Sequence, residues 1–398
     1  MTHPAEPPGP ALLSGGFRPF FLVAGLFGLT AVPAWMLVRR GALELGGPFH
    51  PVDWHIHEML FGYVAAVVAG FLFTAVPNWT GRMPTRGWPL AALAALWLAG
   101  RLAVAGLAPL GPLAAAAVDC AFLAAIAAMI AREIVAGRNW RNLKVVVPVL
   151  LLLAANVAFH AEAAMAGSSD LSRRLGVSAG VFLVMLIGGR IIPSFTRNWL
   201  AQRRADRLPA PFGRFDGIAL GVSAAGLAAW VGAPGTGLAA AGLALGGAAQ
   251  AARMARWRGA ATWRSPLLAM LHVAFAFVPL GLLAAAMGEA GWIAPAAGLH
   301  LLGIGAMAAM TLAVMVRAAR GHTGRSLVAG RGLSLAFALL VAAALLRALE
   351  PLAGGLAEAA VELSALAWTA AFALFAWRAT PWLLRPRVGR KSPSSAPR

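Results

Sequence analysis

The chain has 398 residues, of which 60% are hydrophobic and 12% are charged, and its mean hydropathy is +0.76. A soluble globular domain of this length does not carry so much apolar surface, so the composition excludes that class and predicts a polytopic membrane protein. Lys and Arg total 33 against 14 Asp and Glu. These basic residues lie in short loops, and no segment interleaves them with aromatic residues, which argues against nucleic acid as a partner.

Apolar runs recur along the whole chain, each near the ~20 residues that a helix needs to cross the bilayer. They do not alternate as the strands of a membrane β-barrel do, so the expected fold is all-α, because a helix satisfies its own backbone groups in lipid. The first run is expected to be a retained helix and not a cleaved signal peptide. Breaks at Pro, Gly and charged residues predict about twelve transmembrane helices in one bundle, at 17–38, 56–77, 88–108, 110–131, 143–164, 175–194, 216–233, 235–253, 265–288, 292–316, 328–349 and 358–384.

Positive charge is distributed unevenly between the two ends of these spans. If the N-terminus is cytoplasmic, most Lys and Arg residues lie on the cytoplasmic side. The positive-inside rule therefore predicts an N-in, C-in orientation. The arginines that fall on the outer side are Arg39, Arg40, Arg173, Arg174 and Arg347.

The expected organisation is a single transmembrane domain, 17–384, between two polar ends. A longer loop, 195–215, joins a half at 17–194 to a half at 216–384, and no internal repeat is recognisable in the sequence. The Pro-rich segment 1–16 and the basic cytoplasmic tail 385–398 are expected to be disordered.

Ionisable residues inside spans are costly, so each needs a partner or a function. Arg101 in the third span and Asp119 in the fourth fall at a similar depth, because neighbouring spans run in opposite directions. The first interpretation is a salt bridge between adjacent helices. The alternative gives Arg101, Asp119 and Glu58 a catalytic role in moving protons.

Histidines form the more informative pattern. His55 and His57 open the second span, His160 lies near the outer end of the fifth, and His300 lies near the outer end of the tenth. Imidazoles from three helices at one membrane level predict a metal site, since neutral imidazole is a common ligand of copper and iron. The competing interpretation is that each is a hydrogen-bonded core histidine.

His55 and His57 add a geometric constraint, because residues two apart point about 200° away from each other on a regular helix. Either they serve different centres, or the helix begins after His57 and is capped by Asp53 or its neighbours. Glu58 is then expected to hold an imidazole tautomer or to carry a proton.

A second polar layer lies toward the cytoplasmic side. Most of its arginines can be explained structurally, because their side chains reach the membrane surface and set the topology. Haem propionates, a quinol headgroup or an anionic substrate would also bind them. Its candidate cofactor-binding and ligand residues are Arg82, Arg190, His272, Arg317 and Arg325.

Two methionines of the tenth span, Met307 and Met310, are either packing residues or soft ligands for copper or haem iron. The chain contains no CxxCH motif. Any haem is therefore expected to be non-covalently bound haem b.

The chain resembles the NnrS family in five stretches that follow the family's order. These are FRPFFLVAGLF (17–27), DWHIHEMLFGYVAAVVAGFLFTAVPNWTGR (53–82), GGRIIPSFTRNW (188–199), LHVAFAFVPLGL (271–282) and LHLLGIGAMAAMTLAVMVRAARGHTGR (299–325).

This resemblance implies a twelve-helix bacterial inner-membrane protein that contains haem and copper. It also implies a role in the response to nitric oxide and nitrosative stress, often alongside denitrification. The metal-ligand candidates that it implies are His55, His57, His272, His300 and His322, to which His160 is added.

Three functions are compatible with these features. The first is a haem and copper oxidoreductase that acts on nitric oxide or a related small molecule, with electrons from quinol or a periplasmic donor. The second is a non-catalytic protein that handles or senses metals or nitrosyl species. The third is a multi-pass transporter in membrane lipid, which the missing repeat disfavours.

Overall fold

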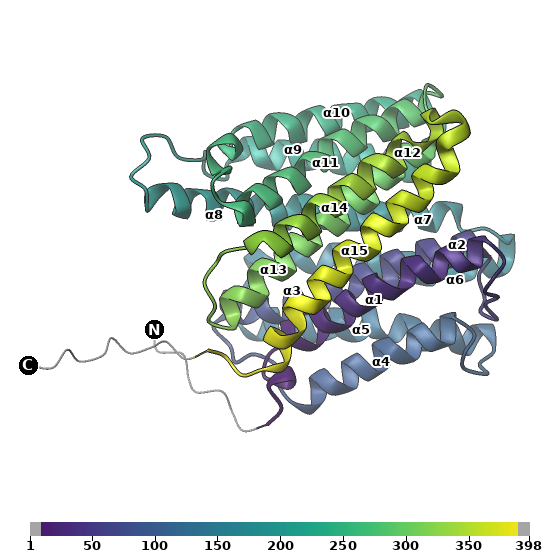
Figure 1. Cartoon of the computed structure of the whole chain (residues 1–398), viewed down its shortest axis with the longest axis horizontal. Helices are drawn as coiled ribbons and strands as arrows, with labels where there is room; N and C mark the ends of the chain where they lie inside the picture. Colours follow the sequence, from purple (N-terminus) through teal and green to yellow (C-terminus); the bar gives the residue numbers. More distant parts are fainter. Residues whose placement is uncertain (1–8, 389–398) are drawn as a thin grey trace, which may run out of the picture.

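A computed structural model describes residues 9–388 as an all-α bundle (Figure 1). The described residues form no strand and twelve rods, where a rod is one helix or several helical segments that follow one another without a break. In chain order the rods are α1 (Phe17–Arg39), α2–η2–α3 (Pro51–His57, Glu58–Val64, Ala65–Thr80), α4 (Trp88–Val104), α5 (Pro112–Ala136), η3–α6 (Trp140–Val145, Val146–Ala166), α7–η4–α8 (Asp170–Leu183, Val184–Gly188, Gly189–Ala201), α9 (Arg214–Gly232), α10 (Gly237–Ala255), α11 (Pro266–Glu289), α12–η6–α13 (Pro295–His300, Leu301–Ala308, Ala309–His322), α14 (Gly330–Leu349) and α15 (Ala357–Leu384).

Ten of these rods are long and apolar enough to cross a membrane. The shorter α4 has 17 residues, and α10 carries Gln250 and Arg253, whose buried polar atoms bond within the protein. The prediction of an all-α polytopic membrane protein is therefore confirmed. Several rods extend beyond their predicted spans; for example, α2 already begins at Pro51, α8 continues to Ala201 and α13 continues to His322.

The predicted disordered ends fall mostly outside the structure. Residues 1–8 and 389–398 lie outside the described residues. Within the predicted N-terminal segment, Ala11–Leu13 form the 3₁₀ turn η1. At the other end, the Val388 N–H donates to the Thr323 carbonyl over 3.0 Å, so the beginning of the tail packs against the bundle.

The rods ending in α3 and α13 finish with the same sequence, Thr-Gly-Arg. Gly81 and Gly324 have φ angles of +70° and +76°, in the left-handed region where glycine carries no Cβ penalty. The hydroxyls of Thr80 and Thr323 donate to carbonyls four residues back, over 2.9 and 2.6 Å. The same local chemistry therefore ends both rods.

The packing groups the rods into three successive sets of four. The last rod of each set packs against the first rod of the next, α5 on α6, α10 on α11, and α15 back on α1. The second rods of the three sets, those that contain α2, α7 and α12, contact one another in all three pairs. They therefore form the centre of a closed ring.

Contacts between the two ends of the chain close this ring. Figure 1 shows α15 lying along α1. A Cβ on Gly25 or Gly28 would lie 2.5 or 2.6 Å from the rings of Phe375 or Phe372, so both glycines allow the close approach. Buried Arg18 donates to the carbonyls that end α15, over 3.2, 3.0 and 2.7 Å.

Candidate metal and ligand site

The rod α2–η2 positions the two neighbouring histidines. It is helical from Pro51, continues without a break through His55 and His57, and changes to a π-helix at Glu58. The hypothesis that the helix begins after His57 is wrong. His55 and His57 face different surroundings, as expected if they serve different centres. The π-helix that follows them is of a kind often found at functional sites.

His57 lies in a buried polar cluster, which we call the carboxylate–histidine cluster. Its members come from four rods and are His57, Glu58, Arg101, Asp119, Asn156 and His160. His57 Nδ1 lies 3.1 Å from Glu58 Oε1, and His57 Nε2 lies 3.0 Å from Asp119 Oδ2. His160 Nε2 approaches the same Asp119 oxygen at 3.0 Å. Two imidazoles and one carboxylate therefore converge on one point.

Arg101 supplies the compensating positive charge. Its Nη1 donates to Glu58 Oε1 over 2.6 Å, and its Nη2 donates to Asp119 Oδ1. The salt bridge predicted between the third and fourth spans is confirmed, and Glu58 extends it to the second. Asn156 donates from Nδ2 to Asp119 Oδ2 over 2.9 Å, so the buried carboxylate is well satisfied.

The cluster has the donor set of a metal site. One ligand atom each from His57, Asp119 and His160 lies within 4.8 Å of the others. Glu58, next to His57 Nδ1, holds the tautomer that leaves Nε2 facing the site, as carboxylates commonly do behind metal-binding histidines. Two imidazoles and a carboxylate suit copper, iron or zinc.

The backbone of η2 makes room for this cluster. A Cβ on Gly62 would lie 2.7 Å from Arg101 Nη1 and 3.2 Å from Glu58 Oε2. Trp97 Nε1 donates to the Gly62 carbonyl over 2.9 Å. Glycine is therefore required where the π-helix passes the guanidinium, and the indole fixes that turn against α4.

His55 faces a separate cavity of about 450 Å³, which we call the histidine cavity. The His55 ring stacks on Trp35 with 4.8 Å between ring centroids. Its buried Nδ1 has no hydrogen-bond partner among the described residues. A buried polar nitrogen without a partner is uncommon and is consistent with a site for a ligand.

His300 lines the same cavity from α12. Its Nδ1 lies 2.7 Å from the Ala296 carbonyl, so Nδ1 carries the proton that it donates and Nε2 keeps a lone pair. His55 lines the cavity from a different helix, α2. The cavity is thus lined by imidazoles from two rods.

Three arginines also line the histidine cavity, Arg39, Arg173 and Arg347. Arg39 pairs with Glu358, and Arg347 Nη1 donates to Glu350 over 2.7 Å. Most of the remaining lining is apolar. This combination suits an apolar ligand that carries acidic groups at one edge.

A comparison with protein-family models supplies the identity. The model described as "NnrS protein" matches residues 11–387. The chain belongs to the NnrS family. A search of curated proteins finds no match. Family membership suggests metal binding, with which the buried His57, Asp119 and His160 group agrees.

The remaining predicted histidines of this NnrS-family chain lie at the other end of the bundle. His272, near the start of α11, has its Nε2 2.9 Å from the Thr196 hydroxyl. His322, at the end of α13, lies against Phe17 with ring centroids 5.4 Å apart. Neither histidine lines the cavity of His55.

The structure also keeps the four predicted cofactor-binding arginines away from the histidine cavity. Arg82 pairs with Glu133 over 2.6 Å. The others contact neighbouring polar or aromatic groups: Arg190 donates to Asn142 over 3.3 Å, Arg317 lies 4.0 Å from the Phe195 ring centroid, and Arg325 lies 5.9 Å from that of Trp382.

The two candidate methionines occupy different places. Met307 lines the histidine cavity, and its sulfur packs where a Cβ on Gly180 would lie 2.6 Å away. Met310 is buried in the core and does not line the cavity. Of the two, Met307 is placed to contact a ligand there.

The cavity is also lined by four residues that were not predicted from the sequence, Arg39, Tyr63, Arg173 and Arg347. The arginines carried a signal, because they are exceptions to the positive-inside distribution and so need another reason to be there. Tyr63 is the single tyrosine of the chain. Its hydroxyl lies 2.7 Å from that of Thr311 and joins η2 to α13.

Proposed function

We propose that this NnrS-family protein is a bacterial inner-membrane haem and copper protein that reacts with nitric oxide. Family membership and the membrane-helical fold support a membrane protein of the nitric oxide response. The observation that carries the finer proposal is the pair of histidine sites that share the turn His55–His57. One site is a cavity and the other a compact three-ligand cluster.

In this proposal haem b occupies the histidine cavity. His55 and His300 both line the cavity and would hold the haem iron through imidazole nitrogens. Arg39, Arg173 and Arg347 each pair with a carboxylate of the chain and would use their remaining N–H groups to hold the propionates. The apolar lining would contact the macrocycle.

Copper is assigned to the carboxylate–histidine cluster, with His57, Asp119 and His160 as ligands. When bound, haem iron and copper supply redox-active centres that bind nitric oxide. Glu58 is the buried carboxylate that would accept a proton beside the copper site, while Asp119 would serve as a ligand, and Arg101 holds both in position. These are the roles proposed for the three residues in a catalytic reaction.

The electron donor is proposed to act at the end of the bundle where α2 begins. Arg82 follows the same rod 27 positions after His55, which corresponds to roughly 40 Å at ~1.5 Å per residue. A quinol beside Arg82 would therefore be remote from the histidine cavity. A periplasmic donor fits the predicted orientation better.

Metal content of single histidine variants tests this assignment. We expect His55→Ala and His300→Ala to lose the haem absorption spectrum but to keep copper. We expect His57→Ala and His160→Ala to lose copper but to keep haem. His272→Ala and His322→Ala are the matched controls and should keep both. Haem retained in both His55→Ala and His300→Ala would refute the haem assignment, with thermal unfolding used to confirm that each variant is folded.

Turnover separates an enzyme from a protein that only captures nitric oxide. The catalytic proposal predicts that one molecule consumes many equivalents of nitric oxide when a reductant is present. Consumption that stops at one equivalent per metal centre would favour the non-catalytic alternative. The buried Asp119 carboxylate, which already contacts His57, Asn156 and His160, is the observation that favours this non-catalytic alternative.

A further inference from the structure

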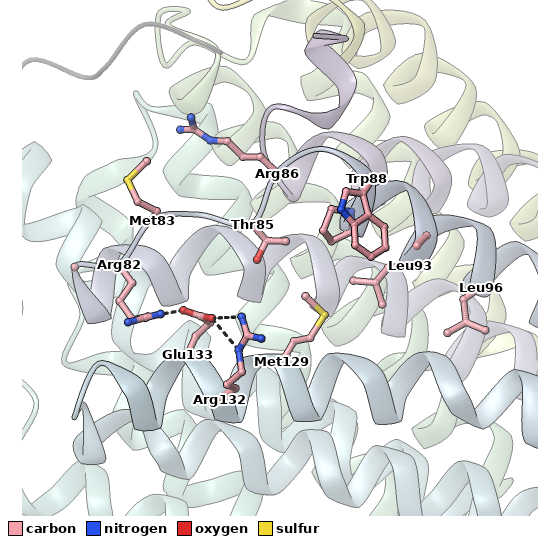
Figure 2. Close-up of a pocket in the computed structure, with 13 residues that line it drawn as sticks. Arg82, Met83, Thr85, Arg86, Trp88, Leu93, Leu96, Met129, Arg132 and Glu133 are labelled. Atoms are coloured by element: carbon pink, nitrogen blue, oxygen red, sulfur yellow. Dashed lines mark hydrogen bonds and ion pairs between the residues drawn. The ribbon is translucent and has the colours of Figure 1, made fainter. Parts of the chain in front are cut away.

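A second large concavity lies at the opposite end of the bundle from the histidine cavity. It has a volume of about 900 Å³ and lies between the end of α3, the start of α4 and the end of α5. We call it the arginine groove, and Figure 2 shows its lining. Its charged residues are Arg82, Arg86, Arg132 and Glu133. The proposed function uses none of them.

The lining of the groove has more positive than negative charge, and ion pairs fix two of its guanidinium groups. Glu133 lies between two guanidinium groups (Figure 2), with Arg82 Nε 2.6 Å and Arg132 Nη2 3.0 Å from its oxygens. Both guanidiniums keep further N–H groups that this carboxylate does not use. Arg86 adds a buried Nε without a hydrogen-bond partner among the described residues. Arg82 and Arg132 thus flank one carboxylate, and Arg86 adds a third positive charge to the lining, which favours an anionic ligand.

One wall of the groove is apolar. Leu93 and Leu96 of α4 and Met129 of α5 line it, and Trp88 lies at its rim (Figure 2). Trp88 is 78% exposed and Met83 is 71% exposed. Tryptophan and arginine side by side at the end of a transmembrane helix are typical of the membrane–water interface.

The short α4 explains why a concavity forms here. Its 17 residues span about 26 Å at ~1.5 Å per residue, less than the ~30 Å of a hydrocarbon core. Its neighbour α5 has 25 residues. The loop that precedes α4 therefore crosses the end of a helix shorter than its neighbours, which leaves an apolar wall beneath a layer of arginines.

We propose that the arginine groove binds an anionic phospholipid. The phosphate is bound by Arg82, Arg86 and Arg132, and an acyl chain lies along Leu93, Leu96 and Met129. Basic pockets between transmembrane helices bind anionic headgroups in this way. A soluble anion would use the arginines but would leave the apolar wall bare. A quinol would have no need of the excess positive charge.

Lipid binding by the purified full-length protein tests the proposal. The groove variant is Arg82→Gln/Arg86→Gln/Arg132→Gln. The matched control, Arg197→Gln/Arg203→Gln/Arg264→Gln, removes three exposed arginines outside the groove. Each protein is placed in nanodiscs of phosphatidylcholine with or without phosphatidylglycerol, and bound lipid is measured by native mass spectrometry after release.

We expect wild type and control to retain phosphatidylglycerol and to unfold at a higher temperature when it is present. The groove variant should lose both effects, with affinity falling about fivefold for each arginine removed. Equal losses in the groove and control variants would overturn the proposal, since the binding would then be general surface attraction. Stabilisation by glycerol phosphate equal to that by the lipid would identify a free-anion site instead. Displacement of the lipid by a short-chain quinone would identify a quinone site.

Discussion

His55 and His57 lie two positions apart on one helix yet face two different sites. His55 stacks on Trp35 in the histidine cavity, whereas His57 is fully buried against Asp119. The short peptide between them is the most direct covalent connection between the two centres. A rotation or shift of α2 would therefore displace both histidines, and with them both sites, together.

Arg101 is expected to be the most sensitive residue of the carboxylate–histidine cluster. Arg101→Gln leaves Glu58 and Asp119 buried without a compensating charge and should cost about 3–5 kcal/mol of folding free energy. Asp119→Asn should cost less, because Glu58 still pairs with the guanidinium at 2.6 Å. In the Arg101→Gln background, adding Asp119→Asn should restore part of the stability, because only Glu58 is then left without a compensating charge. Thermal and chemical unfolding in detergent measure these effects, and simple additivity of the two losses would contradict the coupling.

Gly62 should not tolerate a side chain. Gly62→Ala places a Cβ 2.7 Å from Arg101 Nη1, and overpacking of this kind typically costs about 1–3 kcal/mol. Gly217→Ala is the control, because a Cβ there meets nothing within 4 Å. The alanine at 217 should be neutral or slightly stabilising, since alanine favours a helix. Equal unfolding temperatures for the two variants would show that η2 can shift away from α4.

The arginines of the histidine cavity should determine the affinity for haem without determining its ligation. Substituting Arg39, Arg173 or Arg347 with glutamine removes one charged partner of an acidic group, worth about 1.5–3 kcal/mol for a charged hydrogen bond. Each variant should bind haem roughly tenfold or more weakly, while the absorption bands of the haem that remains bound stay unchanged. Haem titration followed by absorption spectroscopy measures both. Unchanged affinity in all three variants would remove the arginines from the site.

Tyr63 should contribute a modest, local interaction. Tyr63→Phe removes the 2.7 Å hydrogen bond to Thr311, whose hydroxyl keeps its bond to the Ala308 carbonyl at 2.9 Å. The expected cost is about 1 kcal/mol. A double-mutant cycle with Thr311→Val isolates the pair, and a coupling energy near zero would show that the contact does not join η2 to α13.

Part of the internal organisation was present in the sequence but not recognised there. His57 and His300 each precede a π-helix, and each lies the same number of residues before a terminal Thr-Gly-Arg. The motif recurs in the first and third sets of four rods. In the second set, the π-helix η4 begins only at Val184, farther from the start of its rod than η2 and η6 are from the starts of theirs. The repeated helix order becomes evident only from which rods pack together.

The sequence by itself determined the class of the protein and the approximate positions of its helices. Long apolar runs leave the backbone no alternative to helix in lipid, and glycines such as Gly81 and Gly324 end rods through local geometry. The ion pair of Arg101 with Asp119 was also predicted from the sequence, because the depth of a residue in the membrane depends only on the helical rise per residue.

Only the tertiary structure decided which histidines share a site. Depth does not fix the rotation of a helix about its axis, and that rotation depends on packing against every neighbour. His160 therefore joins His57, His300 joins His55, and Arg39, Arg173 and Arg347 gather from three distant segments. His272 and His322 lie at the far end of the bundle, near the start of α11 and at the end of α13.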